Sequence, residues 1–396
     1  MYFHPVLLKP EIKFQLLKNN RKFYISINRK VVDMSKLKKI LDKEKLTKKD
    51  MKYIFELENK KDLKYLYDYA YEVKKKYVGK KAYFRGIIEF SNICEKDCLY
   101  CGIRKSNSKM NRYIMSENEI LEKAKWAYEN GYGSLVLQSG ERHDKEFIDF
   151  VENILKKIKE ISNNALGITL SLGEQQYDTY KKWYDAGAHR YLLRIETSNK
   201  KLYKKLHPSS HNFDTRFNCL KHLKDIGYQV GTGVMVGLPF QTTEDMINDV
   251  LFYKDFNIDM VGMGPYLKHN DTPLAREVKN YSEKKQLKLG LKIIAITRIL
   301  LQDINIAATT ALQALNPVGR ELGLKAGANV VMPNITDKKY REFYKLYENK
   351  PCTDEKSTEC KSCLKNRVES IGENVGFNEW GDSPHYFKRI SQSKNK

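Results

Sequence analysis

Three cysteines stand close together at Cys94, Cys98 and Cys101, directly after the apolar run 86–90. A tetrahedral zinc site needs a fourth protein ligand, and the flanking residues offer no obvious one. Three thiolates instead suit a [4Fe-4S] cluster, because the protein then holds three irons while the fourth stays open to a chelating small molecule. A zinc knuckle or incidental thiols are the alternative, which the C-x3-C-x2-C spacing disfavours.

A second triad lies near the C-terminus, at Cys352, Cys360 and Cys363. Three cysteines do not specify the metal, so this group could hold an iron-sulfur cluster, or zinc with an outside ligand. Cys219 stands alone on an expected helix, and we interpret it as a buried structural thiol. Because the other six cysteines form two tight triads, the sequence favours metal clusters in a reducing compartment over disulfides.

The rest of the chain supplies elements that could position these residues. Strand-like runs alternate with amphipathic segments, and the helix expected at 116–130 opens with a capping box of Ser116 and Glu119. Strict alternation predicts a parallel sheet, and eight strand-helix units match a complete (β/α)8 TIM-type barrel. The expected strands are 86–93, 134–139, 166–172, 190–196, 229–237, 260–266, 304–312 and 328–333. Further helices are expected at 145–162, 174–186, 213–226, 243–256, 284–301, 317–326 and 337–347.

Four parts of the chain can be distinguished. Residues 1–33 form an N-terminal extension to which we assign no function. Residues 34–84 form a helical preface, because apolar residues recur at helical spacing and Gly79 supplies a stop. The barrel spans 85–348, and a C-terminal extension with the second cysteine triad spans 349–396. The predicted fold class is therefore α/β.

Lysine and arginine number 71 against 49 acidic residues, a net charge of +22. Such a charge would suit a basic, metal-stabilised RNA-binding protein, which we keep as an alternative of another class. We prefer a solvated lysine-rich surface, because the lysines spread over expected helices instead of interleaving with aromatic residues. The sequence has no apolar run of about 18 residues and no signal-peptide layout, so we expect a cytoplasmic protein without membrane contact.

Polar residues gather where the expected strands end, which is the edge at which barrel enzymes carry their chemistry. Arg194 and Glu196 share one face of a strand, so they either pair with each other or contact a polar cofactor. The other strand ends carry Gln138, Ser139, Gly140 and Glu141 after the second strand, Thr169 and Ser171 after the third, and Thr309 and Thr310 after the seventh.

The cysteine spacing, with Tyr100 before the third cysteine, resembles the radical S-adenosylmethionine (SAM) superfamily. Longer motifs narrow the resemblance to the [FeFe]-hydrogenase maturase HydE family, over residues 35–380. These motifs lie at 88–92, 191–197, 231–239, 259–266 and 327–334.

The resemblance implies a role for each candidate residue. Cys94, Cys98 and Cys101 would hold the reactive [4Fe-4S] cluster, and Arg216 would suit the methionyl carboxylate of SAM. The second triad resembles an accessory site of some family members, a [2Fe-2S] or [4Fe-4S] cluster. The full implied set for SAM is Tyr100, Gln138, Ser139, Gly140, Glu141, Ser171, Glu196 and Arg216, and the set for substrate is Thr169, Arg194, Thr309, Thr310, Tyr344 and Tyr347.

The function that this resemblance implies is anaerobic, reductive cleavage of SAM to a 5′-deoxyadenosyl radical during assembly of the hydrogenase di-iron site. The substrate would be a small molecule or an organometallic complex, and an electron donor such as ferredoxin or flavodoxin and the other maturases would be partners. A HydE-like relative that acts on an amino acid, as methylornithine synthase does, is the alternative. Sulfur insertion of the biotin-synthase type is disfavoured, because Cys219 is the only spare thiol.

Overall fold

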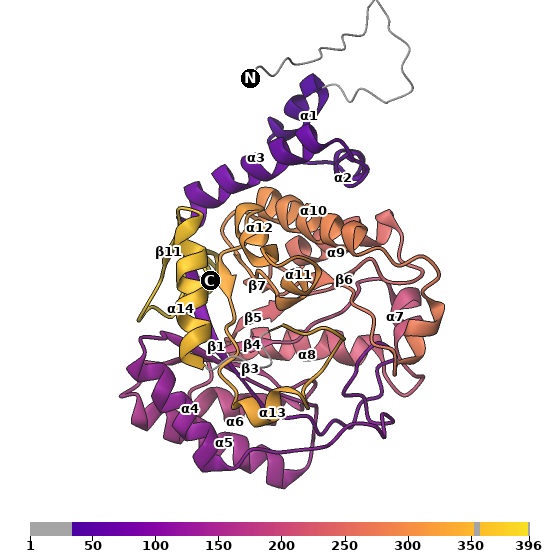
Figure 1. Ribbon diagram of the computed structural model, residues 1–396. Helices are drawn as coiled ribbons and strands as arrows, with labels where there is room; N and C mark the ends of the chain where they lie inside the picture. The colour runs from indigo at the N-terminus through magenta and orange to yellow at the C-terminus, as the bar shows by residue number, and fades with distance from the viewer. Residues whose placement is uncertain (1–33, 352–356, 395–396) are drawn as a thin grey trace, which may run out of the picture.

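The computed structural model describes residues 34–351 and 357–394. Three helices precede the sheet and lie together at one end of the molecule (Figure 1), α1 (Met34–Leu41), α2 (Lys48–Phe55) and α3 (Lys60–Val78). The helical preface is therefore present, and α3 ends at Gly79, as the sequence indicated. The extension expected at 1–33 lies outside the described residues.

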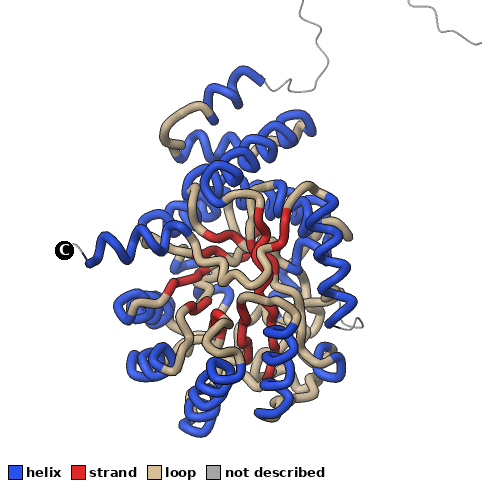
Figure 2. The backbone as a smooth tube through the Cα atoms, turned by 90° about the vertical axis from the view of Figure 1, so that its left-hand side faces the viewer, coloured by secondary structure: helices blue, strands red, loops and turns tan. Residues whose placement is uncertain are grey.

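Eight parallel strands form a curled central sheet, with strands inside and helices outside (Figure 2). The two ends of the sheet meet, because Asn329 N donates to Ile306 O and Ala308 N donates to Val330 O, both at 2.8 Å. The TIM-type fold is confirmed, and each strand falls within or overlaps an expected run. In sheet order these strands are β10 (Val330–Val331), β1 (Lys81–Ser91), β2 (Ser134–Ser139), β3 (Gly167–Ser171), β4 (Arg190–Leu192), β5 (Gln229–Thr232), β7 (Met260–Val261) and β9 (Asn305–Ile306).

Two of the expected strands are each split in two. Beyond β5 and β7 the chain continues into β6 (Met235–Val236) and β8 (Gly264–Pro265), which pair in parallel as a separate two-stranded sheet. The glycine-rich runs 229–237 and 260–266 therefore extend the wall of the barrel past the central sheet.

The helices around the sheet follow the expected pattern, with differences in the second half. The capping box of α4 is present, since Ser116 Oγ accepts from Glu119 N and Glu119 Oε2 accepts from Ser116 N. The expected helices are α4 (Glu117–Glu129), α5 (Lys145–Ile161), α6 (Tyr177–Asp185), α8 (Phe213–Ile226), α9 (Thr243–Asp255), α10 (Glu283–Leu301), α12 (Gly319–Lys325) and a short α13 (Lys338–Arg341). Two others, α7 (Lys200–Leu206) and η1 (Pro273–Glu277), were not expected. The strand expected at 304–312 is wrong at its end, because β9 stops at Ile306 and α11 (Thr310–Leu315) begins after Thr309, its N-cap residue.

The C-terminal segment closes the barrel at the N-terminal ends of its strands. After α14 (Ser357–Ser370), β11 (Asn374–Val375) pairs with the start of β1, and α15 (Pro384–Lys394) ends the described chain. Gly381 O accepts from Arg85 Nη2 at 2.9 Å and from Asn305 Nδ2 at 2.8 Å. This segment therefore covers one end of the barrel, and the opposite end is left for chemistry.

A buried ion pair ties the preface to the C-terminal segment. Lys74 Nζ lies 2.5 Å from Glu373 Oε1, and both side chains are fully buried. Burial lowers the pKa of Lys74 to about 8, although Glu373 opposes this shift. These contacts cross the expected boundaries, and the division of the chain at 34–84, 85–348 and 349–396 stays a prediction.

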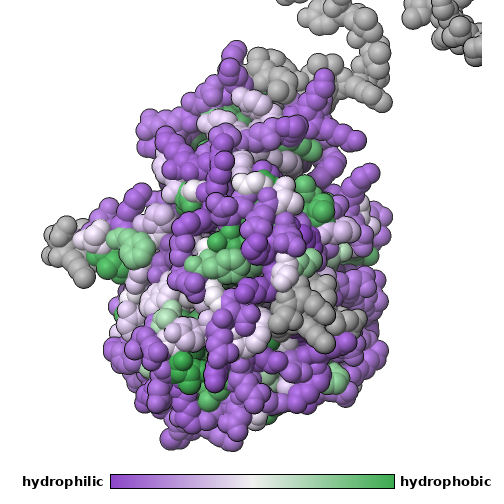
Figure 3. All heavy atoms as spheres, turned by 60° about the vertical axis from the view of Figure 1, so that its left-hand side comes forward, coloured by the Kyte–Doolittle hydropathy of each residue, from purple (hydrophilic) through white to green (hydrophobic). Residues whose placement is uncertain are grey.

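The face in Figure 3 is largely hydrophilic, with hydrophobic side chains in small separate groups. Several lysines pair with acids one helical turn away, such as Lys64 with Asp68 and Lys181 with Asp185. Such exposed pairs contribute little to stability, but they show that positive charge is distributed over helices. Among the described helices, none has the length and apolar composition that a membrane crossing requires.

Candidate active site

A cavity of about 360 Å³ lies at the C-terminal ends of the barrel strands. Among the residues predicted for the site in the barrel, Thr169 is not part of the lining of this cavity. It is buried, and its Oγ1 accepts from Arg190 Nε at 2.9 Å. The remaining predicted cluster, SAM and substrate residues of the barrel line the cavity together: Cys94, Cys98, Cys101, Tyr100, Gln138, Ser139, Gly140, Glu141, Ser171, Glu196, Arg216, Arg194, Thr309, Thr310, Tyr344 and Tyr347.

The cysteine loop is held by the residues between its first two cysteines. Glu95 N donates to Glu141 O at 2.8 Å, which ties the loop to the end of β2. Asp97 accepts from Ser106 N at 3.0 Å and from Arg104 Nη1 at 2.9 Å, which folds the far side of the loop back on itself. The positions of the three cysteines in space therefore depend on contacts that the cysteine motif itself does not reveal.

Gly140 allows the cysteine loop to approach β2 closely. A Cβ at this position would lie 2.2 Å from Ile93 O and 2.8 Å from Cys94 Cβ, which are distances that no side chain tolerates. The next amide, Glu141 N, donates to Cys94 Sγ at 3.4 Å. The absence of a side chain at Gly140 thus lets a backbone N–H reach the sulfur of the first cysteine.

The three thiols lie in surroundings that oppose ionisation. Burial raises the pKa of Cys94, raises that of Cys98 to about 12, and raises that of Cys101 well above its usual range. The neighbouring thiols add to this effect, because negative charges close together repel one another. A bound metal would have to displace these protons, so the site is suited to a cationic group that neutralises three thiolates together.

Two histidines stand beside the cluster loop, and one grouping there could bind a single metal ion. The ligand atoms of Cys98, His207 and His211 lie within 4.8 Å of one another. His207, however, is engaged at both nitrogens, with Tyr203 O at 2.9 Å and with the Tyr100 hydroxyl at 3.2 Å. His207 is thus better explained as a support for Tyr100 than as a metal ligand.

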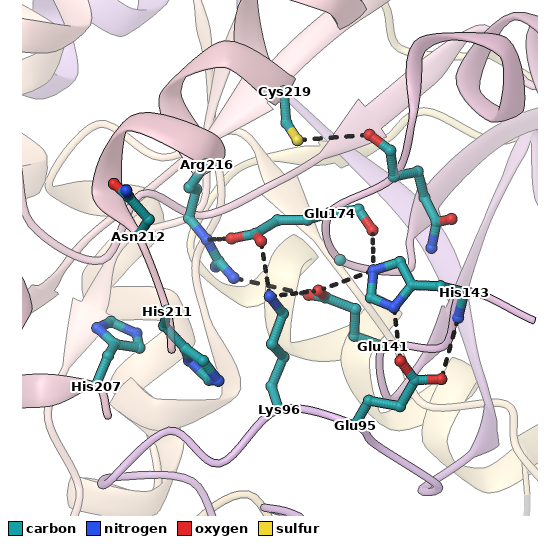
Figure 4. Close-up of polar contacts among 12 residues, drawn as sticks. Glu95, Lys96, Glu141, His143, Glu174, His207, His211, Asn212, Arg216 and Cys219 are labelled. Atoms are coloured by element: carbon teal, nitrogen blue, oxygen red, sulfur yellow. Dashed lines mark hydrogen bonds and ion pairs between the residues drawn. The ribbon is translucent and has the colours of Figure 1, made fainter. Parts of the chain in front are cut away.

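Two acids, Glu141 and Glu174, and two cations, Lys96 and Arg216, form a compact network (Figure 4). Lys96 Nζ lies 2.8 Å from Glu174 Oε2 and 3.2 Å from Glu141 Oε1. Arg216 Nε lies 2.7 Å from Glu174 Oε1, and Arg216 Nη2 lies 3.7 Å from Glu141 Oε2. Burial opposes the charge of Lys96, but the two carboxylates outweigh it and raise the pKa of Lys96. These contacts hold the four side chains in place.

His143 adds a third cation at the edge of this network. The side chain of Glu141 is the main reason that the pKa of His143 is raised to about 9, and Glu95 adds to the shift. His143 Nδ1 lies 2.7 Å from Glu95 Oε2, and Nε2 lies 3.4 Å from Glu141 Oε1. At neutral pH the protonated ring therefore bridges a residue of the cysteine loop and the end of β2.

Arg194 and Glu196 do pair with each other, with Nη2 3.0 Å from Oε2. The backbone of Glu196 has a φ of 65°, which is uncommon for a residue other than glycine. It is held there by hydrogen bonds, since Glu196 N donates to Gly233 O at 3.0 Å and Met235 N donates to Glu196 O at 3.2 Å. Strained backbone of this kind clusters at functional sites.

The C-terminal cysteine triad is described only in part. The side chain of Cys363 is exposed on α14, whereas Cys352 and the side chain of Cys360 lie outside the described residues. The second cluster therefore stays a prediction.

Comparison with known proteins places the chain among relatives of known type. A model of the radical SAM superfamily matches residues 88–253. The [FeFe] hydrogenase maturase subunit HydE of Thermotoga maritima is 47% identical over 320 residues, which cover 81% of this chain and 88% of that protein. The chain belongs to the HydE family. It is a radical SAM enzyme, and membership implies a [4Fe-4S] cluster and SAM as cofactors, together with a small-molecule substrate and an electron donor.

Methylornithine synthases resemble this HydE-family chain less closely. The 3-methylornithine synthase of Methanosarcina acetivorans is 29% identical over 326 residues, or 82% of this chain and 88% of that protein. The crystal structure of methylornithine synthase (PylB) matches 86% of this chain and 97% of that one, with a TM-score of 0.71 and 27% identity. The fold of this chain is therefore shared with methylornithine synthase.

The residues of the HydE-family chain fit both cofactors. The three cysteines supply thiolate ligands, which iron prefers in such clusters, and they share one cavity with a charged network. Arg216 and Glu141 offer a guanidinium and a carboxylate for the two charged ends of an amino acid. The Thr309 hydroxyl is buried and has no hydrogen-bond partner within the described part of the chain, as expected of a group that awaits a ligand.

Several residues of this cavity were missed by sequence reasoning. Four of them line it, namely Lys96, Arg320 and the pair Glu89 and Lys350, whose Oε1 and Nζ lie 2.5 Å apart. The fifth, Glu174, lies behind the lining, where it pairs with Lys96 and Arg216. Each is a charged residue in a chain that is rich in lysine and glutamate, so its residue type alone does not indicate a place in the site. Lys96 and Glu174 could have been suspected from their positions, since one lies between two cysteines and the other follows β3.

Proposed function

We propose that this chain matures the di-iron site of an [FeFe]-hydrogenase by radical SAM chemistry in which Cys94, Cys98 and Cys101 hold the [4Fe-4S] cluster. The observation that carries the proposal is the joint position of these cysteines and of the Lys96 network on one cavity. The 47% identity to the Thermotoga maritima maturase supports the substrate level of the proposal. A cluster and SAM, when bound, supply the electron transfer that breaks a carbon-sulfur bond and yields a 5′-deoxyadenosyl radical.

The residues of this chain would bind SAM, orient it and shield the radical. Arg216, fixed by Glu174, would receive the methionyl carboxylate of SAM, and Glu141 would receive its amino group. Tyr100, supported by His207, would lie near the adenine. Gln138, Ser139, Gly140, Ser171 and Glu196 complete the proposed SAM contacts. Positioning of this kind counts because a radical reacts with whatever lies nearest.

The proposed substrate contacts lie on the same cavity. Arg194, Thr309, Thr310, Tyr344 and Tyr347 line it, and the two threonines follow β9. Thr169 belonged to the expected set, but its hydroxyl serves Arg190 in this structure. The substrate itself would be a small molecule or an iron complex, and ferredoxin or flavodoxin, as well as the other maturases, would be partners.

The second iron-sulfur cluster is proposed on sequence grounds. Cys352, Cys360 and Cys363 would bind it, and they follow the expected barrel in the sequence. We assign it no part in SAM cleavage.

Cleavage of SAM is tested with the reconstituted protein under anaerobic conditions. SAM and dithionite are added, and 5′-deoxyadenosine is quantified for the wild type, Cys98→Ala and Cys219→Ala. Cys219 is a matched control, because its thiol is buried in α8, where it lies 3.6 Å from Gln175 O. We expect product from the wild type and from Cys219→Ala, and none from Cys98→Ala. Equal product from Cys98→Ala would contradict the assignment of the cluster.

The role in maturation is tested separately. The chain is added to a hydrogenase maturation mixture that lacks its own HydE, and hydrogen evolution is measured. Restored activity would support the proposal. Formation of 3-methylornithine from an amino acid mixture, without restored hydrogenase, would instead favour the alternative that the 29% identity to 3-methylornithine synthase suggests.

A further inference from the structure

Helix α7 presents a row of lysines on the outside of the molecule. The run 197–213 contains four lysines and no acidic residue. All four lysines lie on α7 and are exposed, whereas the other residues of the helix are buried. Lys200 pairs with Asp214 at 2.6 Å, but the side chains of Lys201 and Lys204 form no ion pair with any described residue. Positive charge is therefore left on this helix for a partner.

The same helix lies directly against the cysteine loop. Leu99 N, one residue beyond Cys98, donates to Leu206 O at 2.9 Å. Just after the helix, His207 Nε2 lies 3.2 Å from the Tyr100 hydroxyl. In Figure 1, α7 stands at the edge of the molecule, away from α1, α2 and α3. One residue and one hydrogen bond therefore connect Cys98 to a helix of the surface.

A small apolar core fixes α7 and the cysteine loop relative to each other. Leu202 and Leu206 of α7 pack in this core with Leu238, and Leu99 and Tyr100 of the cysteine loop pack against it. This core is separate from the main core of the barrel. Close-packed apolar side chains resist deformation, so a protein that binds to α7 would be held at a fixed distance from the cysteines.

An exposed aromatic ring adjoins the lysines. Phe240, two residues after Leu238, is 50% exposed, and Lys205 Nζ lies 4.7 Å from the centroid of its ring. The φ of Phe240 is 68°, which is uncommon for a residue other than glycine. Gln241 holds this turn, because its Oε1 accepts from Gly237 N at 2.7 Å. A fixed aromatic side chain among charged groups is typical of an anchor in a protein interface.

We call Lys201, Lys204, Lys205 and Phe240 the α7 surface. Its charge is complementary to an acidic protein. SAM cleavage needs an electron donor, and electron transfer slows steeply with distance, so a donor has to dock where little protein separates it from the cysteines. We propose that the α7 surface is the docking site of a small acidic electron-transfer protein. The inference rests on the proposed function for the need of an electron.

Docking on this surface leaves the cavity open. None of the four residues of the α7 surface lines the cavity, so the docked protein does not compete with SAM. The docked protein gives up one electron and is oxidised, and that electron reduces SAM, whose carbon-sulfur bond breaks to leave methionine and a 5′-deoxyadenosyl radical. The radical takes a hydrogen atom from the substrate, or from a buffer molecule where no substrate is present, and becomes 5′-deoxyadenosine.

Binding of a ferredoxin tests the site without a measurement of activity. An acidic ferredoxin in its oxidised form is titrated into the cluster-loaded protein, and calorimetry gives the dissociation constant. We expect binding that weakens as salt is added, and no binding of cytochrome c, a basic electron-transfer protein. The charge-reversal variant should bind ferredoxin at least about ten-fold more weakly. This variant carries Lys201→Glu, Lys204→Glu and Lys205→Glu.

The matched control has the same change of charge on α3, which lies away from α7 (Figure 1). Its three substitutions, at exposed positions of α3, are Lys60→Glu, Lys61→Glu and Lys64→Glu, and it should bind ferredoxin as the wild type does. Phe240→Ala should weaken binding and leave its salt dependence unchanged, because this variant loses an apolar contact and no charge. Equal losses in the two triple variants, an unchanged affinity in the charge-reversal variant, or no binding to the wild type would each overturn the proposal.

Formation of 5′-deoxyadenosine separates the docking site from the proposed function. With saturating dithionite, a small reductant that needs no docking site, the wild type and the charge-reversal variant should cleave SAM at equal rates. With reduced ferredoxin as the reductant, at a concentration below saturation, the variant should be at least about ten-fold slower. Equal rates with ferredoxin, or an equal loss with dithionite, would overturn the docking site. Failure of the wild type to cleave SAM with dithionite would instead overturn the proposed function.

Discussion

Lys96 and Glu174 form an ion pair in which Nζ lies 2.8 Å from Oε2, although 78 positions separate them in the chain. Lys96 belongs to the cysteine loop after β1, and Glu174 follows β3 and holds Arg216 through its other oxygen. The pair thus connects the cluster ligands to the residue proposed for the SAM carboxylate. We therefore expect the position of the loop and the binding of SAM to be coupled through this contact.

Removal of the Lys96 charge should weaken SAM binding. In Lys96→Gln, Glu141 and Glu174 compete for Arg216 alone, so the guanidinium is less free to bind a carboxylate. We expect the dissociation constant for SAM to rise about ten-fold, as loss of a charged hydrogen bond implies. Calorimetric titration of SAM into the cluster-loaded protein measures it. Lys105→Gln, an exposed lysine of the same loop, is the control, and an unchanged affinity in Lys96→Gln would refute the coupling.

A side chain at Gly140 should prevent cluster loading. The Cβ of Gly140→Ala would lie 2.2 Å from Ile93 O, so the cysteine loop must move away from β2. We expect less than half of the wild-type iron content after reconstitution, with an unchanged far-UV circular dichroism spectrum. Gly262→Ala is the control, because its Cβ would meet Leu192 Cδ1 at an ordinary 3.5 Å. Normal iron content in Gly140→Ala would show that the loop tolerates displacement.

The buried carboxyl of Asp249 should make stability depend on pH. Burial raises the pKa of Asp249 to about 7, although Ser198 N and Oγ both donate to its Oδ1 at 2.6 Å. Between pH 4 and pH 7 the folded chain holds this proton and the unfolded chain has lost it. The free energy of unfolding therefore falls as pH rises through this window.

Asp249→Asn replaces the protonated carboxyl by a neutral amide and should remove this dependence. The free energy of unfolding of the variant, relative to that of the wild type, should rise by about 2–3 kcal/mol between pH 5 and pH 8. Urea unfolding at the two pH values measures the change. Asp255→Asn, at an exposed position of the same helix, should show no such growth. Parallel curves for Asp249→Asn and the wild type would show that the carboxyl is ionised in the folded protein.

Loss of the α4 cap should lower stability without an effect on the site. Ser116→Ala removes the oxygen that accepts from Glu119 N, and we expect the free energy of unfolding to fall by about 1 kcal/mol. The urea midpoint reports this change, and iron content should stay at the wild-type value. For Ser106→Ala we expect the reverse, a lower iron content with an unchanged urea midpoint. The reason is that Ser106 Oγ donates to Asp97 Oδ2 of the cysteine loop at 2.7 Å. Equal stability of Ser116→Ala and the wild type would mean that water replaces the cap.

The local chemistry of this protein could be predicted from its sequence. The spacing of Cys94, Cys98 and Cys101 indicated the cluster site, the pattern of Ser116 and Glu119 indicated the start of α4, and alternating segments indicated eight strands. Each of these signals acts over a few residues, through covalent spacing and short-range hydrogen bonds. The barrel then followed, because strand-helix alternation leaves few compact arrangements. With the strand order known, the predicted residues at strand ends were expected to meet, and Thr169 is the exception because its hydroxyl faces Arg190 instead.

Only the tertiary structure decided which charges stand together. Lys96, Glu174 and Arg216 come from three separate segments, and their contacts depend on how the loops cross the mouth of the barrel. The same holds for the C-terminal segment that covers the other end of the barrel, where Gly381 O accepts from Arg85 and Asn305. Arg320 is the clearest case, since any arginine of a basic chain looks solvated until packing buries it. Burial and pairing are properties of the assembled core, and a local pattern of residues does not contain them.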